Sequence, residues 1–234
     1  MPKISVVIPA YNEEKYLGAC LESLVNQNFS KSNYEIIIVD NASTDRTAQI
    51  AHEYPVRVIF EPRLSVVRAF QTGFTAANSP VIATTGADTV CPPDWLASIY
   101  PRFSSPDTVG VYGPVVFLET DHLPTQIFSF LSPYFFHLNH LFGTDMPSGA
   151  NMAVRKNAFL QIGGFDLRLT TAEDTDLYYR LKKVGTFKYL PSLITKTSNR
   201  RLVSMKHRFF THHAANFIRF KLFGHSSSNF RPYR

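Results

Sequence analysis

The amino-acid sequence predicts an α/β protein in which helices cover both faces of a mostly parallel sheet. Short apolar runs alternate with segments whose apolar residues have helical spacing, which is typical of buried parallel strands joined by crossover helices. The chain has 234 residues and 44% of them are hydrophobic, so it can bury a sizeable core. Its 15 Pro and 11 Gly residues follow no repeat, which excludes collagen-like and low-complexity chains.

The first hundred residues carry the clearest pattern. Apolar, β-branched runs predict strands at residues 3–9, 34–39, 56–60 and 81–85. Helical spacing predicts helices at residues 14–26, 45–53 and 65–77. Ligands of such a sheet bind at the carboxyl ends of its strands. The segment from Pro9 to Glu13, after the first strand, is not glycine-rich, so neither a dinucleotide fingerprint nor a Walker loop is present there.

The pattern is weaker after residue 100. It predicts strands at residues 109–117 and 152–154, and helices at residues 93–103, 157–162 and 174–183. The aromatic-rich segment 123–142 has a shorter apolar stretch than the ~20 residues that a membrane span needs. We interpret it as a packing helix in preference to a segment lying at a membrane interface.

Charge is unevenly distributed along the chain. All 18 Asp and Glu residues lie at or before Asp176, whereas 13 of the 24 Lys and Arg residues follow it. Residues 196–234 form a basic, aromatic C-terminal extension, which indicates either an anionic partner, such as a membrane surface or a phosphorylated substrate, or a solvated tail. We expect no nucleic acid partner, because no recognised motif accompanies the basic residues.

The ends of the chain and its cysteines bear on its compartment. Two cysteines, Cys20 and Cys91, are too few for a disulfide scaffold and fit a reducing environment. The first residues run directly into a strand pattern and show no signal peptide.

Three carboxylates stand where chemistry is expected. Asp40 directly follows the second predicted strand and Asp88 follows the fourth, so both are expected at the same edge of the sheet. They can accept hydrogen bonds from a ribose or base, or bind a divalent cation, although loop capping explains them equally well. Asp174 opens a predicted helix, where it is either a general base or a favourable charge in the first turn.

Five segments, in the family's order and covering about residues 3–190, resemble glycosyltransferase family 2. They are KISVVIPAYNEEKYL (3–17), IIIVDNASTDRT (36–47), ATTGADTVCPPDWL (83–96), SGANMAVRKNAFLQIGGFD (148–166) and AEDTDLYYRLKKVG (172–185). The resemblance implies a GT-A fold, with a Rossmann-like, mostly parallel central sheet flanked by helices. It implies a catalytic domain that comprises a nucleotide-binding half and an acceptor half, residues 1–100 and 101–195.

The resemblance also implies an activity and roles for single residues. The expected activity is inverting transfer from a nucleotide-diphosphate sugar, with a UDP-sugar favoured, to a hydroxyl acceptor. Asp174 would deprotonate the acceptor, Asp88 would ligate Mg²⁺ or Mn²⁺ on the diphosphate, and Asp40 would bind the base or ribose. The residues expected around donor and acceptor are Pro9, Ala10, Tyr11, Glu13, Asn41, Arg68, Ala87, Gly149, Ala150, Asn151 and Glu173.

Two departures from the family pattern concern the diphosphate. The usual Asp-x-Asp of the metal loop reads Gly86-Ala87-Asp88, and Arg68 is offset from the usual Arg-Asn-x-Gly segment. The segment 197–201 resembles one that follows the last core strand in some family members, and its arginines are candidates to meet a phosphate of the donor or of a lipid carrier. Further candidate metal ligands are His207, His212 and His213.

The acceptor is the least specified part of the prediction. The aromatic segment 123–142 and the basic extension suggest a lipid-linked or polysaccharide glycan, and a cytoplasmic protein that associates peripherally with the cytoplasmic membrane face. The main alternative is a non-catalytic module that binds a nucleotide sugar or glycan, motivated by Gly86. A nucleotidyltransferase is disfavoured, because that class carries a glycine-rich basic loop after the first strand.

Overall fold

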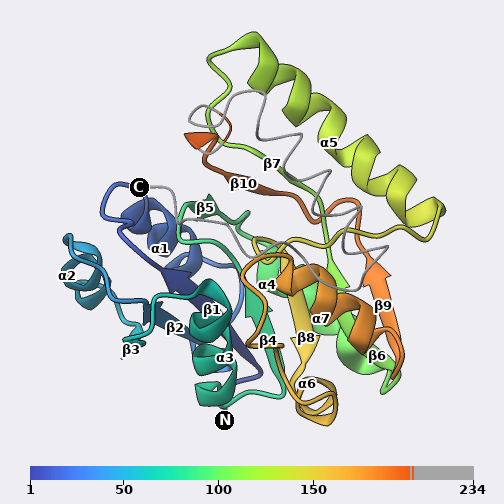
Figure 1. The fold of residues 1–234 in the computed structure, drawn as a ribbon, viewed down its shortest axis with the longest axis horizontal. Helices are drawn as coiled ribbons and strands as arrows, with labels where there is room; N and C mark the ends of the chain where they lie inside the picture. Colours follow the sequence, from blue (N-terminus) through green and yellow to red (C-terminus); the bar gives the residue numbers. More distant parts are fainter. Residues whose placement is uncertain (201, 203–234) are drawn as a thin grey trace.

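The core of the protein is a seven-stranded sheet with the order β3-β2-β1-β4-β8-β6-β9 (Figure 1). The computed structural model describes residues 1–200 and residue 202. Strands β1 to β4 run parallel, and only β8 is antiparallel to its neighbours β4 and β6. The strands are β1 (Ile4–Ala10), β2 (Tyr34–Asp40), β3 (Arg57–Phe60), β4 (Val81–Thr84), β6 (Thr108–Tyr112), β8 (Met152–Arg155) and β9 (Thr186–Tyr189). The predicted mostly parallel sheet is therefore confirmed.

Helices cover both faces of this sheet. Alternate residues of β1 show the two layers, since Val6 and Ile8 pack in one apolar cluster with α1 and α4, whereas Val7 packs in the other with α3, α6 and α7. The helices are α1 (Leu17–Val25), α2 (Thr47–His52), α3 (Val66–Ala76), α4 (Trp95–Ile99), α6 (Lys156–Gln161) and α7 (Glu173–Leu181), with 3₁₀ turns at Lys31–Asn33 and Tyr100–Ser104. Burial on both faces explains why the strands read as continuous apolar runs.

The prediction of one strand over residues 109–117 is wrong. The chain leaves the large sheet after β6 and enters a second sheet as β7 (Val115–Phe117), beside β10 (Thr195–Thr197) and β5 (Thr89–Val90). Gly113 lies at the crossing, where a Cβ atom would stand 2.0 Å from the carbonyl oxygen of Leu193. Pro114, which follows it, has no N–H to donate to a sheet. The Gly113-Pro114 pair, which permits the close approach of Leu193 and interrupts strand pairing, therefore divides the run.

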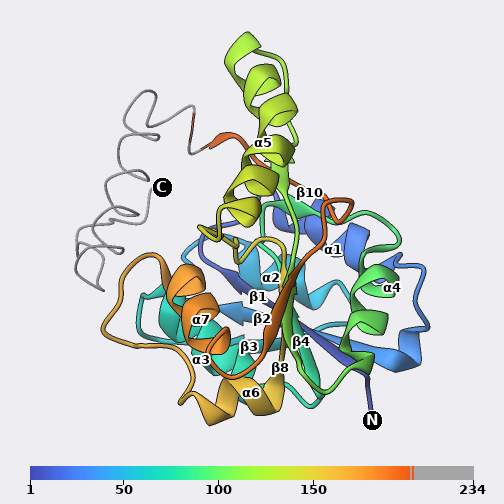
Figure 2. The same cartoon turned by 90° about the vertical axis from the view of Figure 1, so that its right-hand side faces the viewer.

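Helix α5 (Leu123–Leu141) stands beyond the small sheet, away from the main body (Figures 1 and 2). Its buried side chains are polar: the Ser132 hydroxyl donates to the carbonyl oxygen of Val115 at 2.6 Å, and Thr125 is 2% exposed. Phe128 does stack on Phe117, with ring centroids 4.4 Å apart. Most of its large apolar side chains face outward, namely Leu123, Ile127, Phe130, Leu131, Tyr134, Phe135, Leu138 and Leu141. The predicted packing is therefore confirmed only in part: α5 packs on β7 through Ser129, Ser132 and Phe128, and Phe136 packs against the large core.

No helix among the described residues is both long and apolar enough to cross a bilayer. Most of the C-terminal extension, including the three candidate histidine ligands, lies outside the described residues.

Candidate functional site

The predicted site residues gather at the carboxyl ends of β1, β2 and β4. Strands β1 and β2 end in register, with Ala10 opposite Asp40, and the Asn41 N–H donates to the carbonyl oxygen of Ala10 at 2.8 Å. Strand β4 lies on the other side of β1 and leads into the loop that contains Asp88. The expectation that Asp40 and Asp88 share one edge of the sheet agrees with this topology.

The loops after β1 and β2 are tied to each other. The Glu13 N–H donates to the Thr47 hydroxyl at 2.7 Å, and the Asn12 side chain accepts the Thr44 N–H at 2.8 Å. Asn12 itself has φ of 54°, a left-handed conformation that Asn adopts more readily than most residues. Asp40 is 6% exposed and accepts the Ser43 N–H at 3.1 Å. One oxygen of this carboxylate thus holds its own loop.

The side chain of Asn41 has a structural role in place of the predicted substrate contact. Its amide nitrogen donates to the carbonyl oxygens of Glu61 and Arg63 at 3.0 and 2.7 Å, and its oxygen accepts the Ser65 N–H at 2.8 Å. Asn41 is 3% exposed, so it fixes the loop between β3 and α3 against the end of β2.

Asp88 is paired with an arginine from the far end of the described chain. The Arg200 Nη2 atom lies 3.1 Å from Asp88 Oδ2 and also pairs with Glu13 Oε1. The guanidinium lies over the ring of Tyr16, 5.0 Å from its centroid. The Thr197 hydroxyl donates to the other Asp88 oxygen at 3.2 Å. Glu13 and Asp88, 75 positions apart in the sequence, therefore meet at one cation.

The described residues do not fit the expected metal centre. They contain no group of three or more His, Cys, Asp or Glu side chains able to hold an ion. A side chain at Gly86, where the family places an acid, would begin 2.9 Å from both Asp88 Oδ1 and Thr89 Oγ1. One carboxylate that is already paired with an arginine is a poor donor set for Mg²⁺ or Mn²⁺. The predicted metal role of Asp88 is not supported by these residues.

Asp174 lies at the same edge as the end of β4. It is in the first turn of α7, next to Glu173, and its Oδ2 accepts the Gly149 N–H at 3.0 Å. The Thr84 hydroxyl, at the last residue of β4, donates to the carbonyl oxygen of Gly149. Desolvation raises the pKa of the Asp174 carboxyl, although hydrogen bonds from Gly149 and Thr175 partly offset this. A carboxylate with a raised pKa is a better proton acceptor, as a general base requires.

The segment before β8 forms the floor beside Asp174. The carbonyl oxygen of Ala150 accepts the hydroxyls of Thr85 and Thr195 at 3.1 and 3.3 Å. Asn151 is fully buried, and its amide nitrogen donates to the carbonyl oxygens of Pro114 and Leu193, while its oxygen accepts from Trp95. Asn151 therefore shapes the floor from beneath and does not present its side chain to a substrate.

The remaining predicted residues differ in what they present. The methyl groups of Ala10 and Ala87 pack in the apolar core, at 2% and 3% exposure, so any ligand contact uses their main chain. Pro9, Tyr11 and Arg68 are half-buried. The hydrogen bond from Thr72 and, to a smaller extent, the charge of Arg68 lower the pKa of Glu61. Sequence analysis identified Arg200 only as part of a basic segment. Its pairing with Glu13 could not be predicted, because the two residues are 187 positions apart and no local pattern connects them.

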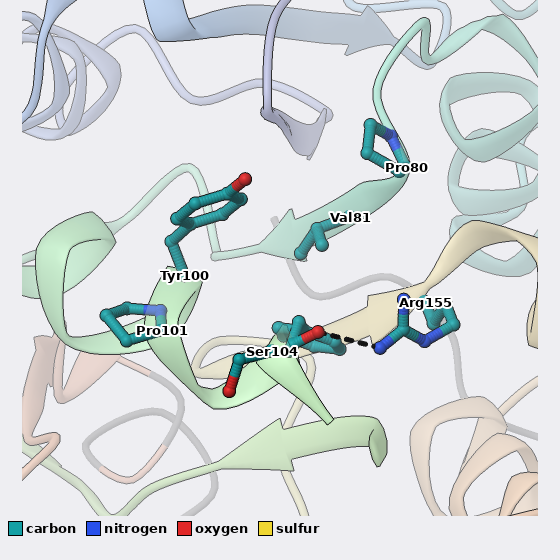
Figure 3. A pocket seen from close by; sticks show the side chains of 7 residues that line it. Pro80, Val81, Tyr100, Pro101, Ser104 and Arg155 are labelled. Carbon is teal, nitrogen blue, oxygen red and sulfur yellow. Dashed lines mark hydrogen bonds between the residues drawn. The ribbon is translucent and has the colours of Figure 1, made fainter. Parts of the chain in front are cut away.

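A small surface pocket lies at the opposite edge, near the start of β4 (Figure 3). Pro80, Val81, Tyr100 and Pro101 line it. Its one charged group, Arg155, donates to carbonyl oxygens of the neighbouring turn, including that of Phe103 at 2.9 Å. This pocket therefore lies apart from the acidic residues and offers no free charged group.

Known proteins resemble this chain in sequence and in fold. The family model described as "Glycosyl transferase family 2" matches residues 5–163. A dolichyl N-acetyl-α-D-glucosaminyl phosphate diacetamido-dideoxyglucuronosyltransferase of Methanococcus voltae is 38% identical over 100 residues, which cover 40% of this chain and 31% of that protein. The first curated relatives are longer proteins, and the matched regions of two of them cover 31% and 50% of their length.

Two solved structures share the fold. Staphylococcus aureus TarS in complex with UDP-GlcNAc aligns with a TM-score of 0.66 and 18% identity, over 84% of this chain and 58% of that chain. The mannosyltransferase PcManGT of Pyrobaculum calidifontis, in complex with GDP-Man and Mn²⁺, aligns with a TM-score of 0.70 and 17% identity, over 93% and 62%. These likenesses show the GT-A fold.

Proposed function

Because the chain belongs to glycosyltransferase family 2 and is a glycosyltransferase, we propose that it transfers a sugar from a nucleotide-diphosphate sugar to a hydroxyl acceptor with inversion. The observation that carries the proposal is the position of Asp174. Its carboxylate is hydrogen-bonded at the end of β4, the edge at which Asp40 and Asp88 also stand. A base beside a donor site is the arrangement that direct displacement needs.

The proposed reaction is a single displacement. The acceptor oxygen forms a bond to the anomeric carbon while the bond from that carbon to the diphosphate oxygen breaks, and Asp174 takes the acceptor proton. Attack from the face opposite the leaving group inverts the anomeric centre, so no covalent enzyme intermediate is required. We route no step through a metal ion, because the described residues do not form a metal centre.

The donor class is supported by the two structural relatives. TarS was solved with UDP-GlcNAc and PcManGT with GDP-Man. We propose a UDP-sugar for this chain and assign Asp40 to the ribose or base, since its remaining carboxylate oxygen can accept a hydroxyl or N–H. A thermal-shift screen of UDP-, GDP-, dTDP- and CDP-sugars tests the donor, because a ligand that binds only the folded state raises the midpoint.

The acceptor is proposed to be a lipid-linked or polymeric glycan. The Methanococcus relative is named for a dolichyl phosphate substrate. The outward apolar side chains of α5, such as Phe130 and Phe135, suit contact with a lipid surface, and the basic extension suits anionic headgroups. We therefore propose peripheral association with the cytoplasmic membrane face.

Vesicle co-sedimentation tests this association. The full chain should pellet with anionic vesicles at low ionic strength, and a Phe130→Ser, Phe135→Ser double variant should pellet less, because it removes two exposed rings. Wild-type protein that stays in the supernatant would contradict the proposal.

The catalytic assignment is tested by Asp174→Asn. We expect turnover to fall by roughly a hundredfold or more, while nucleotide binding persists. The matched control is Asp176→Asn, two residues along the same helix, whose carboxylate is paired with Arg180 at 2.6 Å. Equal turnover in Asp174→Asn and wild type would refute the assignment of Asp174 as the general base. Loss of nucleotide binding in that variant would mean that the substitution disturbs the fold of the site and not only the proton transfer.

A further inference from the structure

Arg200 joins the two loops between which the proposed donor's diphosphate would lie. Its Nη2 atom contacts Glu13, after β1, and Asp88, after β4. Stacking on Tyr16 holds the plane of the guanidinium. Both contacts of Arg200 with these carboxylates use Nη2, and a guanidinium can bind phosphate oxygens through its other N–H groups.

The backbone that carries Arg200 is fixed by the fold. The Ser198 N–H donates to the carbonyl oxygen of Asp88 at 3.0 Å. The Asn199 N–H and side-chain amide both bind Glu119, at 2.9 and 3.0 Å. Strand β10, just before, pairs with β5 and β7. The small sheet therefore positions Arg200 next to Asp88, and the arginine side chain is 29% exposed.

A divalent ion bound to Asp88 would meet this arginine. Two cations on one carboxylate repel each other, so Arg200 disfavours a metal ion there. The loop favours the arginine, because it lacks the second acid at Gly86 and no cluster of three ligands exists among residues 1–200 and 202.

We propose that Arg200 supplies the positive charge that faces the donor diphosphate, so that donor binding by this chain does not require a divalent cation. This deepens the proposed function and rests on it. Arg200 is then a substrate-binding residue, and Asp88 positions it.

The charges around Arg200 predict that replacing Asp88 strengthens the binding of a diphosphate. Asp88 is a negative charge that contacts Arg200, so it stands beside an entering diphosphate and repels it. Asp88→Asn keeps an oxygen that can accept from Arg200 and removes one negative charge. In EDTA this variant should bind a nucleoside diphosphate more tightly than wild type, by roughly threefold or more.

Calorimetry with UDP, UMP, GDP and GMP in EDTA tests the proposal. Wild type should prefer at least one diphosphate over its monophosphate. Arg200→Met should lower the affinity for that diphosphate by roughly tenfold or more, because it loses charge-assisted hydrogen bonds, and should leave the monophosphate affinity nearly unchanged. The control is Arg102→Met, which removes an exposed charge in the turn near the start of β4 and should change neither affinity. Thermal midpoints verify that the variants fold.

Adding Mn²⁺ separates the outcomes. Mn²⁺ should do little for wild type and should strengthen diphosphate binding to Arg200→Met, in which no guanidinium faces Asp88 and the ion can bridge this carboxylate and the diphosphate. A diphosphate preference of wild type that appears only with Mn²⁺, an unchanged preference in Arg200→Met, or weaker diphosphate binding by Asp88→Asn in EDTA would each overturn the proposal. Failure of wild type to bind any nucleotide under either condition would instead refute the proposed function.

Discussion

The first hundred residues and the following hundred are stabilised in different ways. In the first region, strands such as β1 are buried along nearly their whole length and pack on amphipathic helices. In the second, single polar side chains make long-range connections: Asn151 joins β8 to Pro114 and Leu193, and Asp145 gathers Tyr112 and Tyr178. Helix α5 even buries the hydroxyls of Thr125 and Ser132 and exposes most of its rings.

This difference explains why the pattern of apolar residues predicts the structure of the first region better than that of the second. Apolar burial follows period and composition, which are properties of short segments. A buried amide or carboxylate depends on which donors and acceptors the fold brings to it. The sequence therefore predicts the second region less well, although buried polar side chains such as Asn151 and Asp145 have hydrogen-bond partners there.

The largest expected effect compares one phenylalanine from each region. Phe74→Ala, in α3, should lower the free energy of unfolding by about 4 kcal/mol, because its fully buried ring contacts Phe70, Phe159 and Phe165. Phe130→Ala, in α5, should change it by less than about 0.5 kcal/mol, since that ring is 68% exposed. Urea titration measures both, and equal losses would remove the distinction between the two helices.

Next in size is Asn151→Ala. It should cost about 3 kcal/mol, because two buried carbonyl oxygens and the Trp95 indole N–H lose their partner. The control Asn26→Ala breaks exposed hydrogen bonds to Glu22 and should cost under about 1 kcal/mol. Chemical denaturation measures the free energy of unfolding of both variants. A loss in Asn151→Ala as small as that of the control would show that the hydrogen bonds of Asn151 do not stabilise the second region.

The smallest effect concerns Asp145 and depends on pH. Burial alone would raise the pKa of this carboxyl, but hydrogen bonds from Tyr112, Tyr178 and His140 bring it below its usual value. A lowered folded-state pKa adds stability above the unfolded value of about 4, and this stability is lost as pH falls through the folded pKa. Asp145→Asn should cost about 2 kcal/mol at neutral pH, where the carboxylate is ionised.

The same variant should lose part of the acid dependence of stability. Unfolding by urea at a series of pH values below neutral measures it. If wild type and Asp145→Asn lose stability in parallel on acidification, the carboxylate is not the group responsible.

Much of the first region could be predicted from particular residues. The runs around Val6, Ile37 and Ile82 mark strands that are buried on both faces, and Asp40 and Asp88 follow two of them. The edge on which these acids stand follows from parallel pairing. The role of Asn41 could not be predicted, because its partners are carbonyl groups of the loop after β3, which no composition pattern identifies.

In the second region, tertiary contacts overrode local pattern at two points. Gly113 and Pro114 stand inside an apolar run, yet the chain changes sheets there because Leu193 approaches the glycine. The rings of α5 suggested a helix packed by its apolar face, but Ser129, Ser132 and the single ring of Phe128 make the contacts with β7. Periodicity shows that one face of a helix is apolar; it does not show which face meets the protein.

In the first region, the alternation of β1 to β4 with helices, their parallel pairing and the acids after the strands follow from the amino-acid sequence alone, because each depends on neighbours a few residues apart. The pairing of Arg200 with Glu13 and Asp88, and the outward face of α5, follow only from the folded chain. The physical reason is that a charge or an apolar face is a local property, whereas its partner is chosen by how distant segments meet.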